Sequence, residues 1–131
     1  QGESVTIPKI IEICKKYSIP KVLVEANIQG YAFYKMLQNY AKENQCNTIF
    51  HAYTTVGNKH NRIIMQSDFI LQNCYFLNDT EFDYKSYYSL FLDELTKYNE
   101  DGKNDNDDAP DTLAGLIKYI REKNMLKICK S

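Results

Sequence analysis

The chain has no tryptophan and no long apolar run. No stretch of it approaches the roughly 20 consecutive apolar residues that a membrane-spanning helix needs. Its N-terminal residues also lack the basic segment followed by an apolar one that marks a secretion signal. We therefore expect a soluble protein that is not secreted and has no membrane partner.

Sequence patterns for zinc and other transition-metal sites are also missing. The four cysteines lie far apart, form no C-x-x-C pair and have no histidine at zinc-binding spacing. We expect them to be reduced, mostly buried thiols. The two histidines, His51 and His60, are too scattered to indicate a transition-metal site.

An excess of charge of either sign is absent as well. Sixteen lysines and arginines face 17 aspartates and glutamates, so the net charge is -1. Such a balance does not favour nucleic acid binding by the chain as a whole, and any contact with DNA or RNA must be local. At 131 residues the chain is long enough for one core, and we expect a single domain, residues 1–131.

Negative charge is nevertheless concentrated in one place. Residues 105–116 put four carboxylates ahead of an apolar helical pattern, and three of them surround the expected helix start: Asp107, Asp108 and Asp111. Carboxylates this close repel one another and stay ionised together only where solvent or a bound metal compensates their charge. A hard divalent cation such as Mg²⁺, Mn²⁺ or Ca²⁺ is the natural candidate, since these ions take oxygen ligands.

Helix capping is the simpler explanation for any one aspartate. Asp108 would then be the cap and Asp111 a favourable acid in the first turn. One cap needs only one carboxylate, so the group as a whole favours a cation site. A calcium-binding EF-hand is excluded, because a loop starting at Asp101 has Asn106 where glycine is required and Thr112 where glutamate is required. The chain also has no phosphate-binding G-x-x-x-x-G-K-[ST] loop.

Helical and strand patterns alternate along the chain, which predicts an α/β fold. The first helix should start near Thr6, with Pro8 in its first turn, and stop before residues 19–20. The other expected elements are strands at residues 21–25, 48–53 and 74–77, and helices at residues 30–40, 59–71, 88–98 and about 109–123, the last after a polar, acidic loop at 99–108. Glu25 closes the first strand, at the edge where open α/β sheets place their sites.

Four segments resemble motifs of one protein family. Residues 107–115 (DDAPDTLAG) are similar to its last acidic motif, and residues 22–30 (VLVEANIQG) to its second motif, an acid at a strand end followed by asparagine and glycine. Residues 59–63 resemble its basic helix start, and residues 91–95 the segment that leads into the acidic loop. The family is the nuclease domain of phage terminase large subunits. The order and spacing of the motifs agree from about residue 6 to about residue 122.

This resemblance implies a ribonuclease H-like fold of three layers, with a mostly parallel sheet flanked by helices. Such domains hold two divalent ions, about 3.5–4 Å apart, with a cluster of acids. Glu25, Asp107 and Asp108 would then be ligands of Mg²⁺ or Mn²⁺. How Asp107 and Asp108 divide this work stays open. Asp111 would orient a ligand or reach the second ion, with helix capping as the alternative.

Lys59 and Arg62 would neutralise DNA phosphates, an electrostatic contact that is independent of sequence. Without the resemblance, these two residues are better explained as a solvated helix face. The family's first acid lies on a hairpin strand ahead of the first helix, and residues 1–5 contain no such strand. We therefore expect a fragment of a terminase subunit, or a degenerate gene remnant, that is inactive alone. The unpaired sheet edge should promote self-association or leave the chain marginally stable.

The function implied by the resemblance is metal-dependent cutting of concatemeric DNA during genome packaging. The substrate would be double-stranded DNA in the cytoplasm of the bacterial host. Partners would be the terminase ATPase domain, the small subunit and the portal protein. One alternative is a catalytically incomplete module that binds DNA or a partner. Another is a different ribonuclease H-like nuclease, such as a resolvase or transposase core, although residues 107–111 (DDAPD) point away from it.

Overall fold

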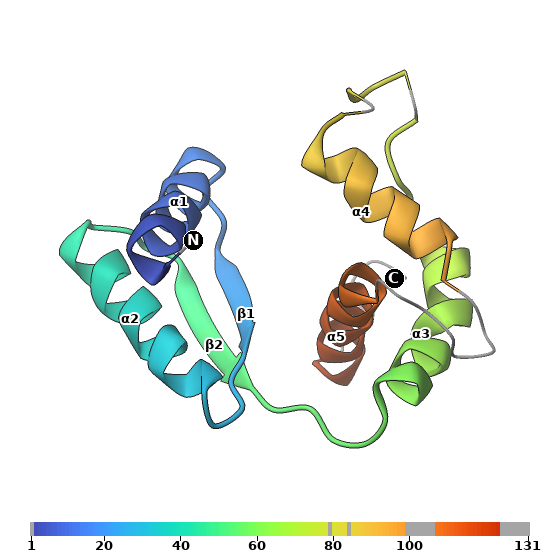
Figure 1. The fold of residues 1–131 in the computed structure, drawn as a ribbon, viewed down its shortest axis with the longest axis horizontal. Helices are drawn as coiled ribbons and strands as arrows, with labels where there is room; N and C mark the ends of the chain where they lie inside the picture. The colour runs from blue at the N-terminus through green and yellow to red at the C-terminus, as the bar shows by residue number, and fades with distance from the viewer. Residues whose placement is uncertain (1, 79, 84, 99–106, 124–131) are drawn as a thin grey trace. The chain divides into compact units, whose positions relative to one another are not determined.

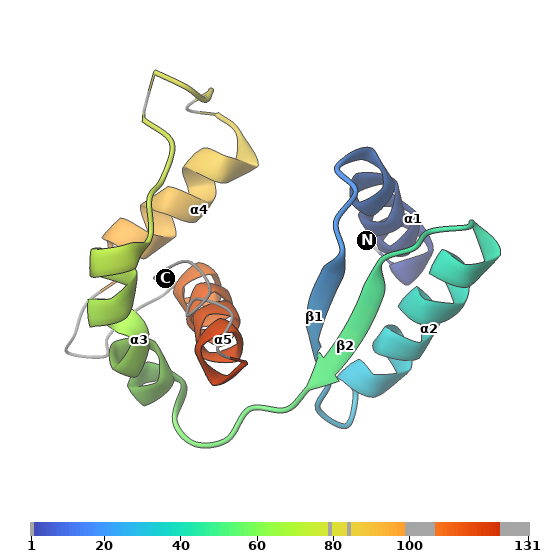
Figure 2. The same cartoon turned by 180° about the vertical axis from the view of Figure 1, so that it is seen from behind.

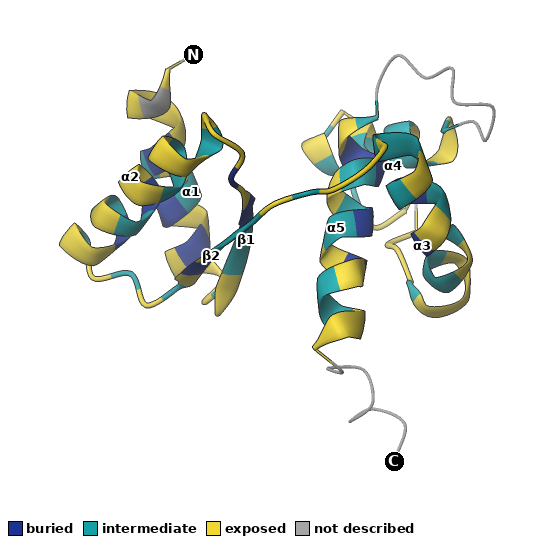
Figure 3. Ribbon diagram, turned by 90° about the horizontal axis from the view of Figure 1, so that it is seen from below, coloured by how far each residue is buried: buried dark blue, intermediate teal, exposed yellow. Residues whose placement is uncertain are grey.

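The computed structural model of the chain describes residues 2–78, 80–83, 85–98 and 107–123. It divides the chain into two compact units, Gln1–Val56 and Gly57–Ser131. Figure 3 shows that each unit has buried positions of its own. Each unit is therefore described by itself.

The first unit is a β-α-β arrangement preceded by a helix (Figures 1 and 2). In chain order its elements are α1 (Glu3–Lys16), β1 (Lys21–Glu25), α2 (Gly30–Glu43) and β2 (Ile49–Tyr53). The two strands pair in parallel, with Lys21 opposite Ile49 and Glu25 opposite Tyr53. Both strands therefore end at the same edge of the sheet, which brings Glu25 next to the residues that follow β2.

Helices α1 and α2 and the two strands enclose the core of the first unit. The apolar stripe of α1 supplies Ile7, Ile11 and Cys14, none of which is more than 4% exposed. The other buried members of this cluster are Val24, Leu37, Ala41 and Phe50. Burying a side chain as large as leucine or phenylalanine contributes roughly 1.5–3 kcal/mol. The cluster includes Val24 and thus holds β1 in place. It thereby fixes the position of Glu25, the last residue of this strand.

Helix α1 begins earlier than the sequence predicted. It starts at Glu3 instead of Thr6, and the carbonyl oxygen of Gly2 accepts hydrogen bonds from the amides of its first turn. Pro8 consequently lies inside the helix, where it removes one backbone N–H from the hydrogen-bond ladder. The predicted start was wrong because Thr6 was taken as a cap for the apolar stripe, whereas the polar turn before the stripe is helical too.

Three helices make up the described part of the second unit: α3 (Lys59–Asn73), α4 (Tyr87–Thr96) and α5 (Asp108–Glu122). Helix α5 packs against both α3 and α4. Its buried positions are Ala109, Pro110, Ala114 and Ile117. Because the apolar face of α5 is held between two helices, the start of α5 is fixed next to the start of α3. Residues 99–106 of the predicted acidic loop lie outside the described residues.

The predicted strand at residues 74–77 is wrong. These residues form no strand, and Tyr75 and Leu77 are 95% and 50% exposed. The amide of Leu77 donates to the hydroxyl of Tyr88 at 2.9 Å instead of to a neighbouring strand. The apolar run alone was misleading, because a strand also needs a partner for its backbone groups.

The helices and the small parallel sheet of two strands confirm the predicted α/β class. Cys14 is buried and Cys46 and Cys74 are partly buried, and all three are free thiols. Cys129 lies outside the described residues. None of the described helices is both long enough and apolar enough to cross a membrane.

Candidate active site

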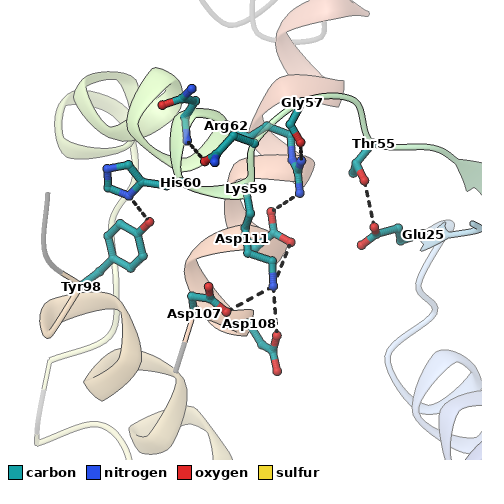
Figure 4. A network of polar contacts seen from close by, with 12 residues as sticks. Glu25, Thr55, Gly57, Lys59, His60, Arg62, Tyr98, Asp107, Asp108 and Asp111 are labelled. Carbon is teal, nitrogen blue, oxygen red and sulfur yellow. Dashed lines mark hydrogen bonds and ion pairs between the residues drawn. The ribbon is translucent and has the colours of Figure 1, made fainter. Parts of the chain in front are cut away.

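Glu25 stands at the edge of the sheet where both strands end. Its side chain is exposed, and Oε1 accepts a hydrogen bond from the Thr55 hydroxyl at 2.9 Å (Figure 4). Thr55 reaches this position because it follows Tyr53, which lies opposite Glu25 in the sheet. The hydroxyl holds one carboxylate oxygen in place. Sequence reasoning missed Thr55, and its place just beyond a strand end was the signal available.

The loop after β1 gives Asn27 and Gly30 structural roles. Asn27 Oδ1 accepts a hydrogen bond from the Gly30 amide at 3.1 Å, and the Asn27 carbonyl accepts one from the Tyr31 amide at 3.1 Å. A Cβ atom at Gly30 would lie 2.6 Å from the carbonyl oxygen of Glu25, which is too close for unbonded atoms. Asparagine and glycine therefore let α2 start directly against the strand end that carries Glu25.

In the second unit, three aspartates at the start of α5 converge on one ammonium at the start of α3 (Figure 4). Lys59 Nζ lies 3.2 Å from an Asp107 oxygen, 3.7 Å from an Asp108 oxygen and 4.0 Å from an Asp111 oxygen. We call these four residues the Lys59 cluster. Their spacing in the first helical turn brings the three carboxylates to one side of the helix. The charge crowding expected from the sequence is present, and Lys59 supplies compensation for it.

Arg62 brings a second positive charge to this cluster. Its Nη2 atom lies 3.4 Å from Asp111 Oδ1, and its Nη1 donates to the carbonyl oxygen of Gly57 at 2.7 Å. The Arg62 and Asp111 side chains are only 18% and 14% exposed. By contrast, the Asp108 side chain is 95% exposed, so water screens its interaction with Lys59 strongly. Asp111 is therefore the most firmly held acid of the group.

The aspartates change the titration of Lys59. A hydrogen bond from the ammonium to Asp107 is the main cause that raises the pKa of Lys59 above its ordinary value of 10.5. The charges of Asp107, Asp111 and Asp108 act in the same direction, and burial acts against them. Lys59 is therefore positively charged throughout the neutral pH range.

Tyr98 and His60 form an aromatic pair in the same unit. Their rings stack with centroids 5.6 Å apart, and the Tyr98 hydroxyl is hydrogen-bonded to His60 Nδ1 (Figure 4). Burial raises the pKa of Tyr98 above its ordinary value of 10.0, and the charges of Asp107 and Asp111 add to the shift. The Tyr98 hydroxyl is therefore protonated at neutral pH. This pair packs one end of α3 against the residues that follow α4.

The helix cap considered for Asp108 is not formed. Helix α5 starts at Asp108, and the capping position belongs to Asp107, whose side chain makes no capping hydrogen bond. Glu94 of α4 instead accepts a hydrogen bond from the Ala109 amide at 3.3 Å. The capping explanation failed because Lys59 attracts the Asp107 carboxylate, while a carboxylate from another helix receives the free N–H. Glu94 lies in segment 91–95, which was expected to lead into the acidic loop. The sequence did not predict that Glu94 would accept a hydrogen bond from the start of α5.

The donor chemistry of the Lys59 cluster suits a hard divalent ion, since carboxylate oxygens are what Mg²⁺ and Mn²⁺ prefer. The spacing is that of ion pairs: oxygens lie 3.2 to 4.0 Å from Lys59 Nζ, whereas Mg²⁺ binds oxygen at about 2.0–2.1 Å. Within the described ranges, no three acidic, histidine or cysteine side chains are grouped as a metal site. The three carboxylates thus surround the Lys59 ammonium. They would have to move closer together to coordinate an ion.

Comparison with known families decides what kind of domain this is. Residues 2–75 match the family model described as the terminase bacteriophage T7 ribonuclease H-like domain, which is more than half of the 131-residue chain. The chain belongs to this family. No curated protein and no solved structure gives a significant match.

Membership in the terminase ribonuclease H-like family confirms the resemblance to a terminase nuclease domain and the ribonuclease H-like fold. The matched residues include Glu25 and run through α3, but end before α5. The structure brings Lys59 and Arg62 together with the three aspartates, whereas Glu25 belongs to the first unit. The individual roles assigned from the sequence stay predictions for Glu25, Lys59, Arg62, Asp107, Asp108 and Asp111.

Proposed function

We propose that the chain is the nuclease part of a phage or prophage terminase large subunit, and that the parent protein cuts concatemeric double-stranded DNA during genome packaging. The observation that carries the proposal is the match of residues 2–75 to the terminase ribonuclease H-like domain. Two features of the structure support it. Glu25 stands at the carboxyl end of parallel strands, where α/β enzymes place their sites, and the aspartates of α5 gather around a cation.

In this proposal Glu25, Asp107 and Asp108 hold divalent ions, Mg²⁺ or Mn²⁺ and two in number. When bound, such ions activate a water molecule and stabilise the leaving oxygen of the phosphodiester. The chain's own residues position these ligands. Thr55 holds one oxygen of Glu25, at 2.9 Å. Asp111 pairs with Arg62, and both side chains are largely shielded from solvent. Asp111 held in this way orients the neighbouring aspartates.

Lys59 and Arg62 are the proposed contacts to DNA. Both lie in the first turn of α3. Cations placed beside an acidic site allow a phosphate to approach, because the acids alone would repel it. Contacts of this kind do not depend on the base sequence. The proposed partners in the host cytoplasm are the ATPase domain, the small subunit and the portal protein of the packaging assembly.

A second candidate function is a catalytically inactive module that binds DNA or a packaging partner. One observation favours it: Lys59 and Arg62 already neutralise much of the charge of the aspartates. A cluster compensated from within the chain can be stable without any ion. The two candidates differ in whether divalent ions bind and whether DNA is cut.

Nicking of supercoiled plasmid by the 131-residue chain in the presence of Mn²⁺ tests the nuclease proposal. Glu25→Gln keeps the size of the side chain but removes the charge that would attract the ion, so nicking should fall below detection. Glu12→Gln is the matched control, because Glu12 is an exposed acid on α1 in the same unit. It should nick like the unchanged chain.

Nicking that continues after chelation of divalent ions, or that Glu25→Gln leaves unchanged, would contradict the metal-dependent site. If no protein nicks DNA, the second candidate is favoured. A gel-shift assay with a linear duplex then measures whether the chain binds DNA at all.

A further inference from the structure

Lys35 on α2 lies against two aromatic rings. Its Nζ is 5.5 Å from the ring centroid of Tyr31 and 5.9 Å from that of Tyr34, and the two ring centroids are 5.7 Å apart. An ammonium is attracted to the face of an aromatic ring, so the two tyrosines hold the lysine head in place. The Gln38 amide donates to the Tyr34 hydroxyl at 2.7 Å, which fixes one of the rings. We call Tyr31, Tyr34 and Lys35 the Lys35 platform.

The rings position the charge of Lys35 without cancelling it. Lys35 is exposed, and it forms no ion pair with any residue that the structure describes. The two cations of the second unit differ in this respect, because Lys59 faces three aspartates and Arg62 pairs with one of them. The charge of Lys35 can therefore act fully on an anion from outside the chain.

The surroundings of Lys35 also favour an anion. Residues 26–42 contain two lysines and no acidic residue. The first unit carries six lysines and four glutamates, whereas the second carries ten lysines and arginines and 13 aspartates and glutamates. The charge balance of the whole chain thus conceals a basic first unit. A polyanion is attracted to this unit and repelled by the charge of the second.

The platform belongs to the helix that starts at the candidate catalytic acid. Gly30, the first residue of α2, is so close to the end of β1 that a Cβ atom there would lie 2.6 Å from the Glu25 carbonyl oxygen. Lys35 follows five residues later, about 7.5 Å along the helix axis. Successive phosphates of a DNA strand follow about every 3.4 Å of the duplex axis. A strand that passes Glu25 can therefore present a phosphate to Lys35.

We propose that the Lys35 platform binds the DNA backbone beside Glu25: Lys35 contacts a phosphate, and the rings of Tyr31 and Tyr34 position its ammonium. This inference rests on the proposed function, because it names a further contact to the same substrate. The contact does not read the base sequence, since phosphates carry none. It needs no divalent ion, so it is measured separately from cleavage.

Fluorescence anisotropy with a labelled linear duplex, in the presence of a chelator, tests the contact. Lys35→Gln should weaken binding about threefold or more and lower the slope of log affinity against log salt by about 0.9, the share of one phosphate contact. Lys35→Arg keeps the charge and should retain the slope. Lys16→Gln is the matched control, because Lys16 lies 5.2 Å from the Tyr17 ring centroid, just before β1 starts, whereas Glu25 ends that strand. It should leave the slope unchanged.

The positioning role of Tyr31 has its own pair of variants. Tyr31→Leu keeps an apolar side chain but removes the ring, and affinity for the duplex should fall about two- to fivefold, the strength of an exposed cation–π contact. Tyr31→Phe keeps the ring and should bind like the unchanged chain. Tyr17→Leu is the control, since Tyr17 is 64% exposed and belongs to the other lysine–tyrosine pair. It should have no effect on binding.

A measurement on the unchanged chain avoids any folding defect of a variant. Bound DNA should shield the Lys35 amine, so brief labelling with an amine-reactive ester should decrease severalfold at Lys35. Lys16 serves as the internal reference and should be labelled equally with and without DNA. Poly-glutamate replaces DNA in a parallel sample, and it should protect Lys35 much less than DNA does.

The outcomes separate this inference from the proposed function. An unchanged slope in Lys35→Gln, with constant labelling of Lys35, would overturn the platform and leave the nuclease proposal standing. Equal protection by poly-glutamate would make the platform a general anion site and overturn its assignment to DNA. Weaker binding in Lys35→Gln, with no nicking by the unchanged chain, would support the platform and contradict the nuclease. Absence of DNA binding by the unchanged chain would overturn both.

Discussion

Gly30 occupies a position where a side chain does not fit. A Cβ atom there would lie 2.6 Å from the carbonyl oxygen of Glu25 and 3.4 Å from Asn27 Oδ1. The first of these atoms belongs to the backbone at the end of β1, so it cannot rotate away as a flexible side chain would. The glycine of the E-A-N-x-x-G segment thus has a steric explanation, and it is linked through one backbone atom to the candidate catalytic acid.

Gly30→Ala should reduce the free energy of unfolding by about 1–3 kcal/mol, the usual cost of forcing extra volume into a packed site. Urea denaturation followed by circular dichroism measures this change. Gly2→Ala adds the same methyl group where the nearest atom is 3.9 Å away, and it should cost less than about 1 kcal/mol. Equal effects of the two substitutions would contradict the steric explanation.

Lys59 should make stability depend on alkaline pH. Its pKa in the folded chain is raised above 10.5, mainly by the hydrogen bond to Asp107. Its ion pairs therefore contribute stability that is fully present below pH 10.5 and is lost as the pH rises through the higher folded-state pKa. Thermal melts from about pH 9 to about pH 12 should show a smaller alkaline loss for Lys59→Met than for the unchanged chain.

Tyr98 also has a raised pKa, chiefly because of burial, and it causes an alkaline loss of the same sign. The charge of Lys59 lowers the pKa of Tyr98, so the alkaline loss caused by Tyr98 should be somewhat larger in Lys59→Met. A smaller total loss in the variant would therefore come from the missing titration of Lys59 itself. At neutral pH the variant should be less stable by roughly 1 kcal/mol, since exposed ion pairs are individually weak. Parallel curves across the alkaline range would show that the ion pairs of the Lys59 cluster do not contribute.

Among the elements, α5 depends on α4 for its first turn. Glu94 accepts a hydrogen bond from the Ala109 amide, which has no partner within its own helix. Glu94→Ala should therefore lower the free energy of unfolding by about 0.5–2 kcal/mol, the range measured for lost helix caps. Asp93→Ala, at an exposed neighbouring position on the same helix, is the control. Denaturant titration of both variants would reveal an equal loss if the hydrogen bond had no effect.

The elements that could be predicted are those whose signal is local. Each of these patterns is complete within a few residues: the apolar stripes predicted α1, α3 and α5, and the apolar run at residues 21–25 predicted β1. The structure has a helix or strand at each of these positions. The start of α1 was misplaced because capping residues are ambiguous in sequence. The strand at residues 74–77 failed because a strand also depends on distant partners, which no local pattern contains.

The same division between local and distant signals holds for the candidate site. Asp107, Asp108 and Asp111 were predicted to crowd because they are neighbours in one helical turn. Their partner Lys59 is 48 residues from Asp107 in sequence, and its role required the packing of α3 on α5. The Glu25 contact to Thr55 spans 30 residues and follows from the strand register. Neither contact could be inferred from spacing alone.

At the scale of the whole molecule, the sheet of the first unit should govern association. Its described part has two strands, so each strand pairs on one side. Sheet edges of this kind pair with other chains, and lysine at an edge suppresses the pairing. We expect sedimentation velocity to show association that increases with protein concentration, and Ile49→Lys on β2 to reduce it.

Ile28→Lys is the matched control, because Ile28 is 98% exposed in the loop after β1 and lies outside the strands. It adds the same charge and removes the same apolar side chain, so it should leave association unchanged. A single monomeric species at every concentration would refute edge pairing.

The internal compensation of the aspartates also bears on the order of events during biosynthesis. Lys59 and Arg62 supply counter-charge as soon as α3 and α5 meet, so folding of the second unit need not wait for divalent ions from the cell. Under the proposed function, folding and loading with ions would then be separate steps in time. The domain would reach its folded state before it could cut DNA.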